Sequence, residues 1–172
     1  IQEGQIGKPH LLHIISRDPS PPPLEYVRVS GGLFFDMTIH DFDMARFLLG
    51  EVEELYACAA VRIDPKIGEA GDVDTALITL KFADGSLGTI DNSRQAVYGY
   101  DQRVEVFGSE GAVRSENLYH DEGTLSTARC VERGLPQNFF MDRYPSPYPT
   151  EKAAFITHPT KQRPFNKTGA GE

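Results

Sequence analysis

The stretch from residue 52 to residue 131 constrains the fold most, because it consists of short strand-like segments separated by turns. β-Branched and aromatic residues recur there at a period of two, which is typical of β-strands. The dipeptide Asp84-Gly85 predicts a tight hairpin, and residues 108–111 predict a second antiparallel turn. We therefore expect an open, mostly antiparallel sheet with strands at 52–63, 73–82, 87–95, 103–107, 111–115 and 124–131.

The two faces of the strand at 73–82 differ in polarity. One face carries the apolar residues Ala76, Ile78, Leu80 and Phe82, and most of the other consists of Thr75, Thr79 and Lys81. This alternation predicts helices packed on one face, and a second face left to water or to a partner subunit. The sequence thus favours an α+β fold that forms a homo-oligomer through the uncovered face of its sheet.

The first fifty residues predict one strand, one loop and one helix. Residues 10–17 form a short apolar run that is typical of a buried strand, and the four prolines of 18–23 keep the next segment extended as far as Gly31. That loop could line one side of a ligand site. Apolar residues at helical spacing then predict a helix over about 36–50, ending at Gly50. Its predicted core-facing residues are Phe35, Ile39, Phe42, Ala45, Leu48 and Leu49.

Composition limits the class of protein. A chain of 172 residues, 40% hydrophobic and 24% charged, fits one globular domain, here with an irregular proline-rich tail over about 135–172. A net charge of −8 without a Lys/Arg cluster disfavours nucleic acid and anionic membranes as partners, and no apolar run approaches the roughly 20 residues that span a bilayer. The N-terminus lacks both an initiator Met and a signal-peptide pattern, so we expect a cytoplasmic chain that begins in mid-protein. Cys58 and Cys130 lie in apolar runs and are expected to be buried thiols.

The predicted helix carries the chemistry. Asp36 and His40 are one helical turn apart, and Asp43 follows on the same predicted face. A carboxylate next to an imidazole can fix its tautomer and support general acid–base catalysis near neutral pH. The alternative is structural, with Asp36 capping the helix and His40 a partly buried polar group. The density of acidic groups, Asp41 included, favours a functional role.

Other chemistries are weaker candidates. No second histidine stands at metal-ligand spacing, and no Gly-x-Ser-x-Gly elbow suggests a hydrolase, so we expect neither a metal site nor a nucleophilic triad. A Gly-x-Gly-x-x-Gly fingerprint for a dinucleotide is also missing. The pair Gly31-Gly32 is interpreted as a point of close backbone packing.

The run Gly31-Gly32-Leu33-Phe34-Phe35-Asp36-Met37-Thr38-Ile39-His40-Asp41-Phe42-Asp43, with Phe47-Leu48-Leu49-Gly50, resembles the signature of the glucose-fructose oxidoreductase/inositol dehydrogenase (Gfo/Idh/MocA) family. Similar matches occur around Gly4–Pro9, at 82–86 and at 104–112, and the likeness is strongest to the inositol dehydrogenase branch. It covers about residues 4–112 and does not extend to the proline-rich tail.

The resemblance implies a function. Such enzymes oxidise a secondary alcohol of a polyol or sugar, and NAD or NADP is bound mainly by an N-terminal Rossmann domain. Residues 1–172 would then be the C-terminal substrate and oligomerisation domain, inactive without that partner domain. In this likeness His40 takes the hydroxyl proton, Asp36 orients the substrate or His40, and Asp43 hydrogen-bonds a substrate hydroxyl. Tyr98 and Tyr100 could approach the cofactor.

A second hypothesis, from another functional class, remains open. The chain could be a non-catalytic sugar-binding or oligomerisation module that uses its sheet to dimerise. Turnover of a polyol after the upstream domain is restored distinguishes the two hypotheses.

Overall fold

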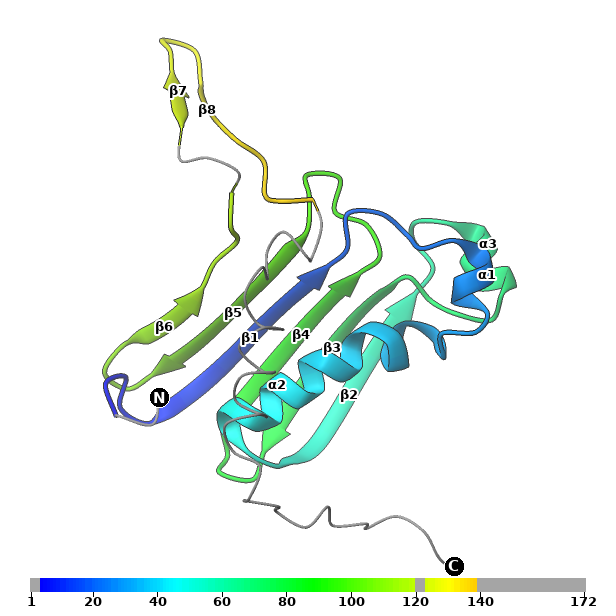
Figure 1. The fold of residues 1–172 in the computed structure, drawn as a ribbon. Coiled ribbons are helices and arrows are strands. Elements are labelled where there is room, and N and C mark those ends of the chain that lie inside the picture. Colours follow the sequence, from blue (N-terminus) through cyan, green and yellow to red (C-terminus); the bar gives the residue numbers. More distant parts are fainter. Residues whose placement is uncertain (1–3, 120–122, 139–172) are drawn as a thin grey trace, which may run out of the picture.

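The structure, a computed structural model, describes residues 4–119 and 123–138. Its centre is a six-stranded sheet in the order β2-β3-β4-β1-β5-β6, in which only the neighbours β1 and β4 run parallel (Figure 1). The strands are β1 (Pro9–Arg17), β2 (Val52–Ala60), β3 (Thr75–Phe82), β4 (Leu87–Ser93), β5 (Asp101–Gly108) and β6 (Ala112–Ser115). The predicted α+β class and the mostly antiparallel sheet are confirmed.

Four helical segments accompany the sheet in the described residues. They are α1 (Leu24–Val27), the π-helical turn η1 (Phe34–Thr38), the helix α2 (Ile39–Leu49) that continues from it, and α3 (Pro65–Glu69). Helix α2 crosses one face of the sheet over β2, β3 and β4, while α1 and α3 lie together at one end (Figure 1). Of the helices in the described residues, none covers the same face of β1, β5 and β6. No helix in the described part of the chain is long and apolar enough to cross a membrane.

The core lies between α2 and the sheet. The predicted alternation of β3 is confirmed, since Ala76, Ile78, Leu80 and Phe82 are all at most 3% exposed. Both predicted turns are also present, because β3 pairs antiparallel with β4 and β5 pairs antiparallel with β6. Apolar side chains from the strands, from η1 and α2, and from the residues just before β1 and η1 complete the cluster: Ile6, Leu12, Ile14, Leu33, Met37, Ala45, Ile90 and Val106.

The predicted apolar face of the helix is partly wrong. Phe35 is 76% exposed and Ile39 is 45% exposed, whereas Met37, Asp41 and Ala45 are buried. The reason is the π-helical turn at Phe34–Thr38, whose extra residue per turn rotates the chain relative to a regular α-helix. The predicted helix end at Gly50 is confirmed, with φ of 88°.

Three local predictions are corrected. The segment from 18 to 31 is not extended throughout, because α1 begins directly after Pro23, whose fixed φ suits the residue before a first helical turn. The predicted strand at 124–131 is a two-stranded ribbon, β7 (Thr124–Ser126) and β8 (Val131–Arg133). The Thr127 hydroxyl accepts the backbone N–H groups of Arg129 and Cys130, and this side-chain turn breaks the strand. Cys58 and Cys130 are both exposed, since each lies in a strand or turn that nothing in the described residues covers.

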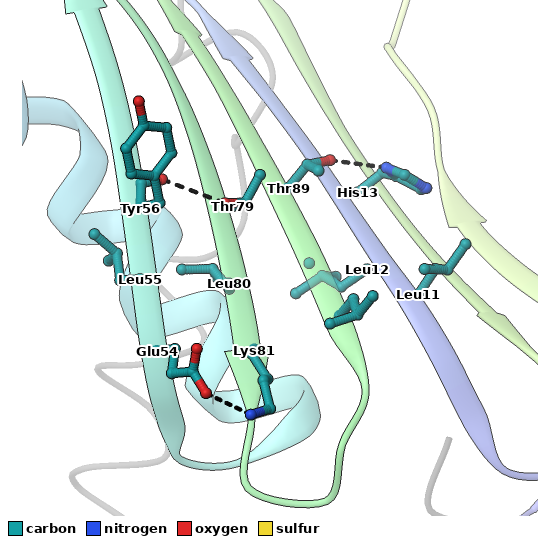
Figure 2. A pocket seen from close by; sticks show the side chains of 12 residues that line it. Leu11, Leu12, His13, Glu54, Leu55, Tyr56, Thr79, Leu80, Lys81 and Thr89 are labelled. Carbon is teal, nitrogen blue, oxygen red and sulfur yellow. Dashed lines mark hydrogen bonds and ion pairs between the residues drawn. The ribbon is translucent and has the colours of Figure 1, made fainter.

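The second face of the sheet is exposed and mixed in polarity. We call it the open face, and its residues are Leu11, His13, Glu54, Tyr56, Cys58, Leu77, Thr79, Lys81, Leu87 and Thr89. Figure 2 shows part of it, where Lys81 pairs with Glu54 and the His13 ring lies 2.8 Å from the Thr89 hydroxyl. A groove of about 450 Å³ follows this part of the sheet. The exposed apolar residues of the open face include Leu77, which is 54% exposed.

Candidate active site

The start of the helix is shaped by two glycines. Gly31 and Gly32 have φ values of 87° and 83°, which L-residues with side chains rarely adopt. A Cβ on Gly32 would lie 2.7 Å from the Asp72 carboxylate, and that carboxylate accepts the Leu33 backbone N–H at 3.0 Å. The interpretation of the pair as a point of close packing is therefore confirmed. An acidic side chain also occupies the helix start that a pyrophosphate would need, so this segment does not fit a dinucleotide.

Asp36 lies in η1 and has both carboxylate oxygens engaged. The Tyr26 hydroxyl donates to Oδ1 at 2.6 Å, and Arg94 Nη1 donates to Oδ2 at 2.6 Å. The hydrogen bond to Asp36 raises the pKa of the Tyr26 phenol. Among the described residues no hydrogen bond joins Asp36 to His40, so the orientation of Asp36 comes from these two other side chains.

Arg94 follows β4 directly and is only 2% exposed. Besides its bond to Asp36, its guanidinium lies 3.9 Å from Asp18 and 3.9 Å from Asp72. Burial raises the pKa of Asp18, Arg94 opposes that effect, and the nearby Asp36 adds to it. One arginine thus connects the proline-rich segment, the π-helical turn and the loop before β3.

His40 is the second residue of α2 and is exposed to solvent. It lines the same cavity as Asp36, as their spacing predicted. The next residue, Asp41, is 4% exposed and accepts a hydrogen bond from Asn92 Nδ2 at 2.7 Å. Burial raises the pKa of Asp41 to about 6, while hydrogen bonds from Asn92 and Ser16 and the charge of His40 act in the opposite direction.

Asp41 belongs to a buried network that ties the helix to the sheet. The Thr38 hydroxyl donates to Asn92 Oδ1 at 2.6 Å, and the amide of Gln102 donates to the Ser16 hydroxyl. The network therefore runs from β5 through β1 and β4 to the start of α2. Because Thr38 and Asp41 lie on either side of His40 in the chain, these hydrogen bonds hold the start of α2 against the sheet.

The structure does not bring Asp43 to this group. Asp43 is exposed, and the helical position that follows His40 along the cavity wall is Met44. Tyr98 and Tyr100, the two tyrosines predicted to approach the cofactor, lie in different surroundings. Tyr100 lines the cavity, whereas Tyr98 donates to Asp101 at 2.6 Å and accepts from Arg17 at 3.0 Å. Burial, followed by the bond to Asp101, raises the pKa of Tyr98.

The cavity that holds Asp36 and His40 has a volume of about 1100 Å³, and we call it the site cavity. It lies on the helix side of the sheet, between α2, the proline-rich segment and the uncovered part of β1, β5 and β6. Its polar lining is Ser16, Asp18, Ser20, Tyr26, Asp36, His40, Asp41, Arg94, Tyr100, Gln102, Arg114, Ser115 and Asn138. This volume is ample for one small polyol, whose hydroxyls need several donors and acceptors. The residues that the structure describes hold no cluster of three or more potential metal ligands.

Sequence reasoning missed Arg94, Tyr26 and Asn92. A charged residue directly after an apolar strand, as at Arg94, is the one signal that could have indicated a buried ion pair. Tyr26 and Asn92 gave no such signal, because their partners lie 10 and 51 residues away along the chain.

A family model for the GFO/IDH/MocA C-terminal domain matches residues 1–114. The chain belongs to the Gfo/Idh/MocA family. Within it, the chain is 54% identical over 157 residues to a myo-inositol 2-dehydrogenase from Thermotoga maritima, covering 91% of this chain and 47% of that protein. It is 50% identical over 157 residues to an inositol 2-dehydrogenase from Rhizobium meliloti, covering 91% of this chain and 48% of the relative.

Solved structures of the family agree with the fold. A putative myo-inositol dehydrogenase from Sinorhizobium meliloti 1021 has a TM-score of 0.90 at 47% identity, covering 97% of this chain and 51% of that chain. A scyllo-inositol dehydrogenase from Lactobacillus casei, with bound NAD(H) and scyllo-inositol, has a TM-score of 0.79 at 28% identity, covering 91% of this chain and 48% of that one. The chain thus spans about half the length of the curated relatives it matches.

Proposed function

We propose that this chain is the substrate-side domain of an NAD(P)-dependent inositol 2-dehydrogenase, which oxidises a secondary alcohol of a polyol to a ketone. The observation that carries the proposal is the site cavity, where an acceptor carboxylate, Asp36, and an exposed imidazole, His40, line one space large enough for a polyol. The names of the relatives, which are inositol dehydrogenases, support the substrate class. We expect the protein to act in the cytoplasm.

The proposed proton acceptor is His40. The substrate hydroxyl gives its proton to the imidazole, the C–H hydrogen leaves as hydride, and the C=O bond forms. NAD or NADP, held mainly by a separate N-terminal domain, accepts the hydride. The Asp72 carboxylate, which binds the Leu33 N–H just before η1, is consistent with the nucleotide lying in that other domain.

The carboxylates are proposed to recognise hydroxyl groups. Asp36 accepts a substrate O–H within the site cavity. The proposed hydrogen bond from Asp43 to a substrate hydroxyl rests on the family likeness, because Asp43 does not line the site cavity. Of the two proposed cofactor-facing tyrosines, Tyr100 has the better support, since Tyr98 is engaged by Asp101 and Arg17.

The proposed partners are an N-terminal Rossmann domain and further copies of the chain. The open face is the proposed surface between copies, because its exposed leucines Leu11, Leu77 and Leu87 gain from burial in a subunit interface. Its Lys81–Glu54 pair (Figure 2) leaves little unbalanced charge to oppose such contact.

The test is to join this chain to the N-terminal half of the Thermotoga maritima relative, which we call the fusion enzyme, and to follow NADH absorbance with myo- and scyllo-inositol. We expect turnover by the fusion enzyme and none by the chain alone. A fusion enzyme that is folded and binds NAD, yet reduces no NAD with any inositol or related sugar, contradicts the proposal and favours a non-catalytic sugar-binding module.

A further inference from the structure

The two partners of Asp36 differ in how firmly each is held. Arg94 is 2% exposed, whereas Tyr26 is 48% exposed. Arg94 Nη1 binds Asp36 Oδ2 and Tyr26 binds Oδ1, and the two contacts are equally short at 2.6 Å. The carboxylate therefore has one buried partner and one partner at the surface.

Arg94 cannot leave the site without a large cost. Its guanidinium is bonded to Asp36 and lies 3.9 Å from Asp18 and from Asp72, so that three carboxylates from three different segments balance its charge. Removing a buried charge from its ionic partners leaves those partners uncompensated, which is strongly unfavourable. Arg94 also lines the site cavity, so the carboxylate it holds faces the space where a substrate would bind.

Tyr26 is held by much less. It belongs to α1, which spans only four residues after the proline-rich segment, and among the described residues its one side-chain hydrogen bond is to Asp36. A phenol O–H is the same kind of donor as a polyol O–H, and both satisfy a carboxylate oxygen in the same way. A hydroxyl of the substrate can thus take the place of the phenol on Oδ1.

We propose that Arg94 is the positioning residue of Asp36, and that Tyr26 is an exchangeable stand-in that leaves Asp36 Oδ1 when a substrate hydroxyl arrives. This inference rests on the proposed function and extends it, because it names the residue that orients Asp36. The Asp36 carboxylate lines the site cavity before substrate binds, and its Oδ1 has a hydrogen-bond donor both before and after the exchange.

The experiment measures kcat and KM for myo-inositol in the fusion enzyme with Tyr26→Phe, Arg94→Met and Arg94→Lys. Tyr26→Phe removes a competing donor, so KM falls by about three- to tenfold while kcat changes by less than about twofold. Arg94→Met releases Asp36 and lowers kcat/KM by about 100-fold, mainly through kcat. Arg94→Lys restores part of this loss, since it keeps the charge without the planar fork. The matched controls are Tyr119→Phe and Arg46→Met, neither of which lines the site cavity.

The outcomes separate the inference from the proposed function. A KM that rises or stays unchanged in Tyr26→Phe overturns the inference, as does an Arg94→Met variant with kcat within about twofold of the parent. If Arg94→Met does not fold, Tyr26→Phe decides alone, because it deletes only an exposed hydroxyl. A parent fusion enzyme without activity toward any inositol overturns the proposed function itself, and that result is read before any variant is compared.

Discussion

At the scale of single residues, the most unusual feature is a buried carboxylate beside the proposed base. Asp41 is 4% exposed, lines the site cavity, and relies on Asn92 and Ser16 for hydrogen bonds. Burial is the largest influence on its pKa and raises it to about 6, against the hydrogen bonds and the charge of His40. Asp41 therefore loses its proton at a pH well above that of an ordinary aspartate.

The raised pKa of Asp41 leads to a prediction about stability. Its pKa is higher in the folded chain than the ordinary value of 3.8, so folding favours the protonated form. The stabilisation is complete below about pH 4 and is lost as the pH rises through about 6, a change of at most about 3 kcal/mol in the free energy of unfolding. In urea unfolding, the free energy of unfolding of Asp41→Asn minus that of the parent should therefore increase as the pH is raised from 4.5 to 7.5. Glu53→Gln, at an exposed position on β2, is the control, and equal pH slopes for parent and Asp41→Asn would contradict the assignment.

At the scale of secondary-structure elements, local pattern predicted most of the sheet but not the register of the helix. Alternation and the Asp84-Gly85 turn define β3 and β4 because both signals act within a few residues. The π-helical turn at Phe34–Thr38 leaves no comparable signal, since it satisfies contacts with Asn92 and Asp72 from later parts of the chain. Helical spacing predicts that Asp36 and His40 lie at one site. It does not predict the exposed position of Asp43, because the register of the helix is changed by the π-helical turn.

The glycine turn that starts η1 gives the second prediction. Gly32→Ala combines a positive φ with a Cβ placed 2.7 Å from Asp72, so Asp72 must shift away from the Leu33 N–H it binds. We expect a loss of about 2–3 kcal/mol in the free energy of unfolding. Gly71→Ala is the matched control, because it has φ of 84° with open space around it and should cost about 1 kcal/mol. Chemical denaturation of both variants measures the difference, and equal losses would show that contact with Asp72 is unimportant.

At the scale of the whole molecule, the two faces of the sheet have separate tasks in this account. The helix side carries the core and the site cavity, and the open face carries the exposed leucines. The order β4-β1-β5 puts the first strand in the middle of the sheet, so the proline-rich segment leaves β1 directly beside Arg94 and Asp36. Local pattern could not predict this placement, because it depends on pairings between residues more than 70 positions apart. The predicted tail at 135–172 lies almost entirely outside the described residues.

The open face gives the third prediction. Leu77 lies on the open face in β3 and is 54% exposed. Leu77→Glu should therefore weaken association of the chain by at least about tenfold if copies pack through this face. Light scattering across a concentration series measures the mass. Phe47→Glu is the control, because Phe47 is 77% exposed on α2, on the other side of the sheet. A strictly monomeric parent chain would contradict association through this surface.

The central claim is that His40 accepts the hydroxyl proton during oxidation of an inositol, and its most direct test is kcat for NAD reduction by the fusion enzyme with His40→Ala. We expect kcat to fall by about 100-fold or more, as loss of a general base usually requires. His10→Ala, at the far end of β1 against Phe107, is the control and should keep the parent rate. A His40→Ala enzyme with kcat close to that of the parent would contradict the account.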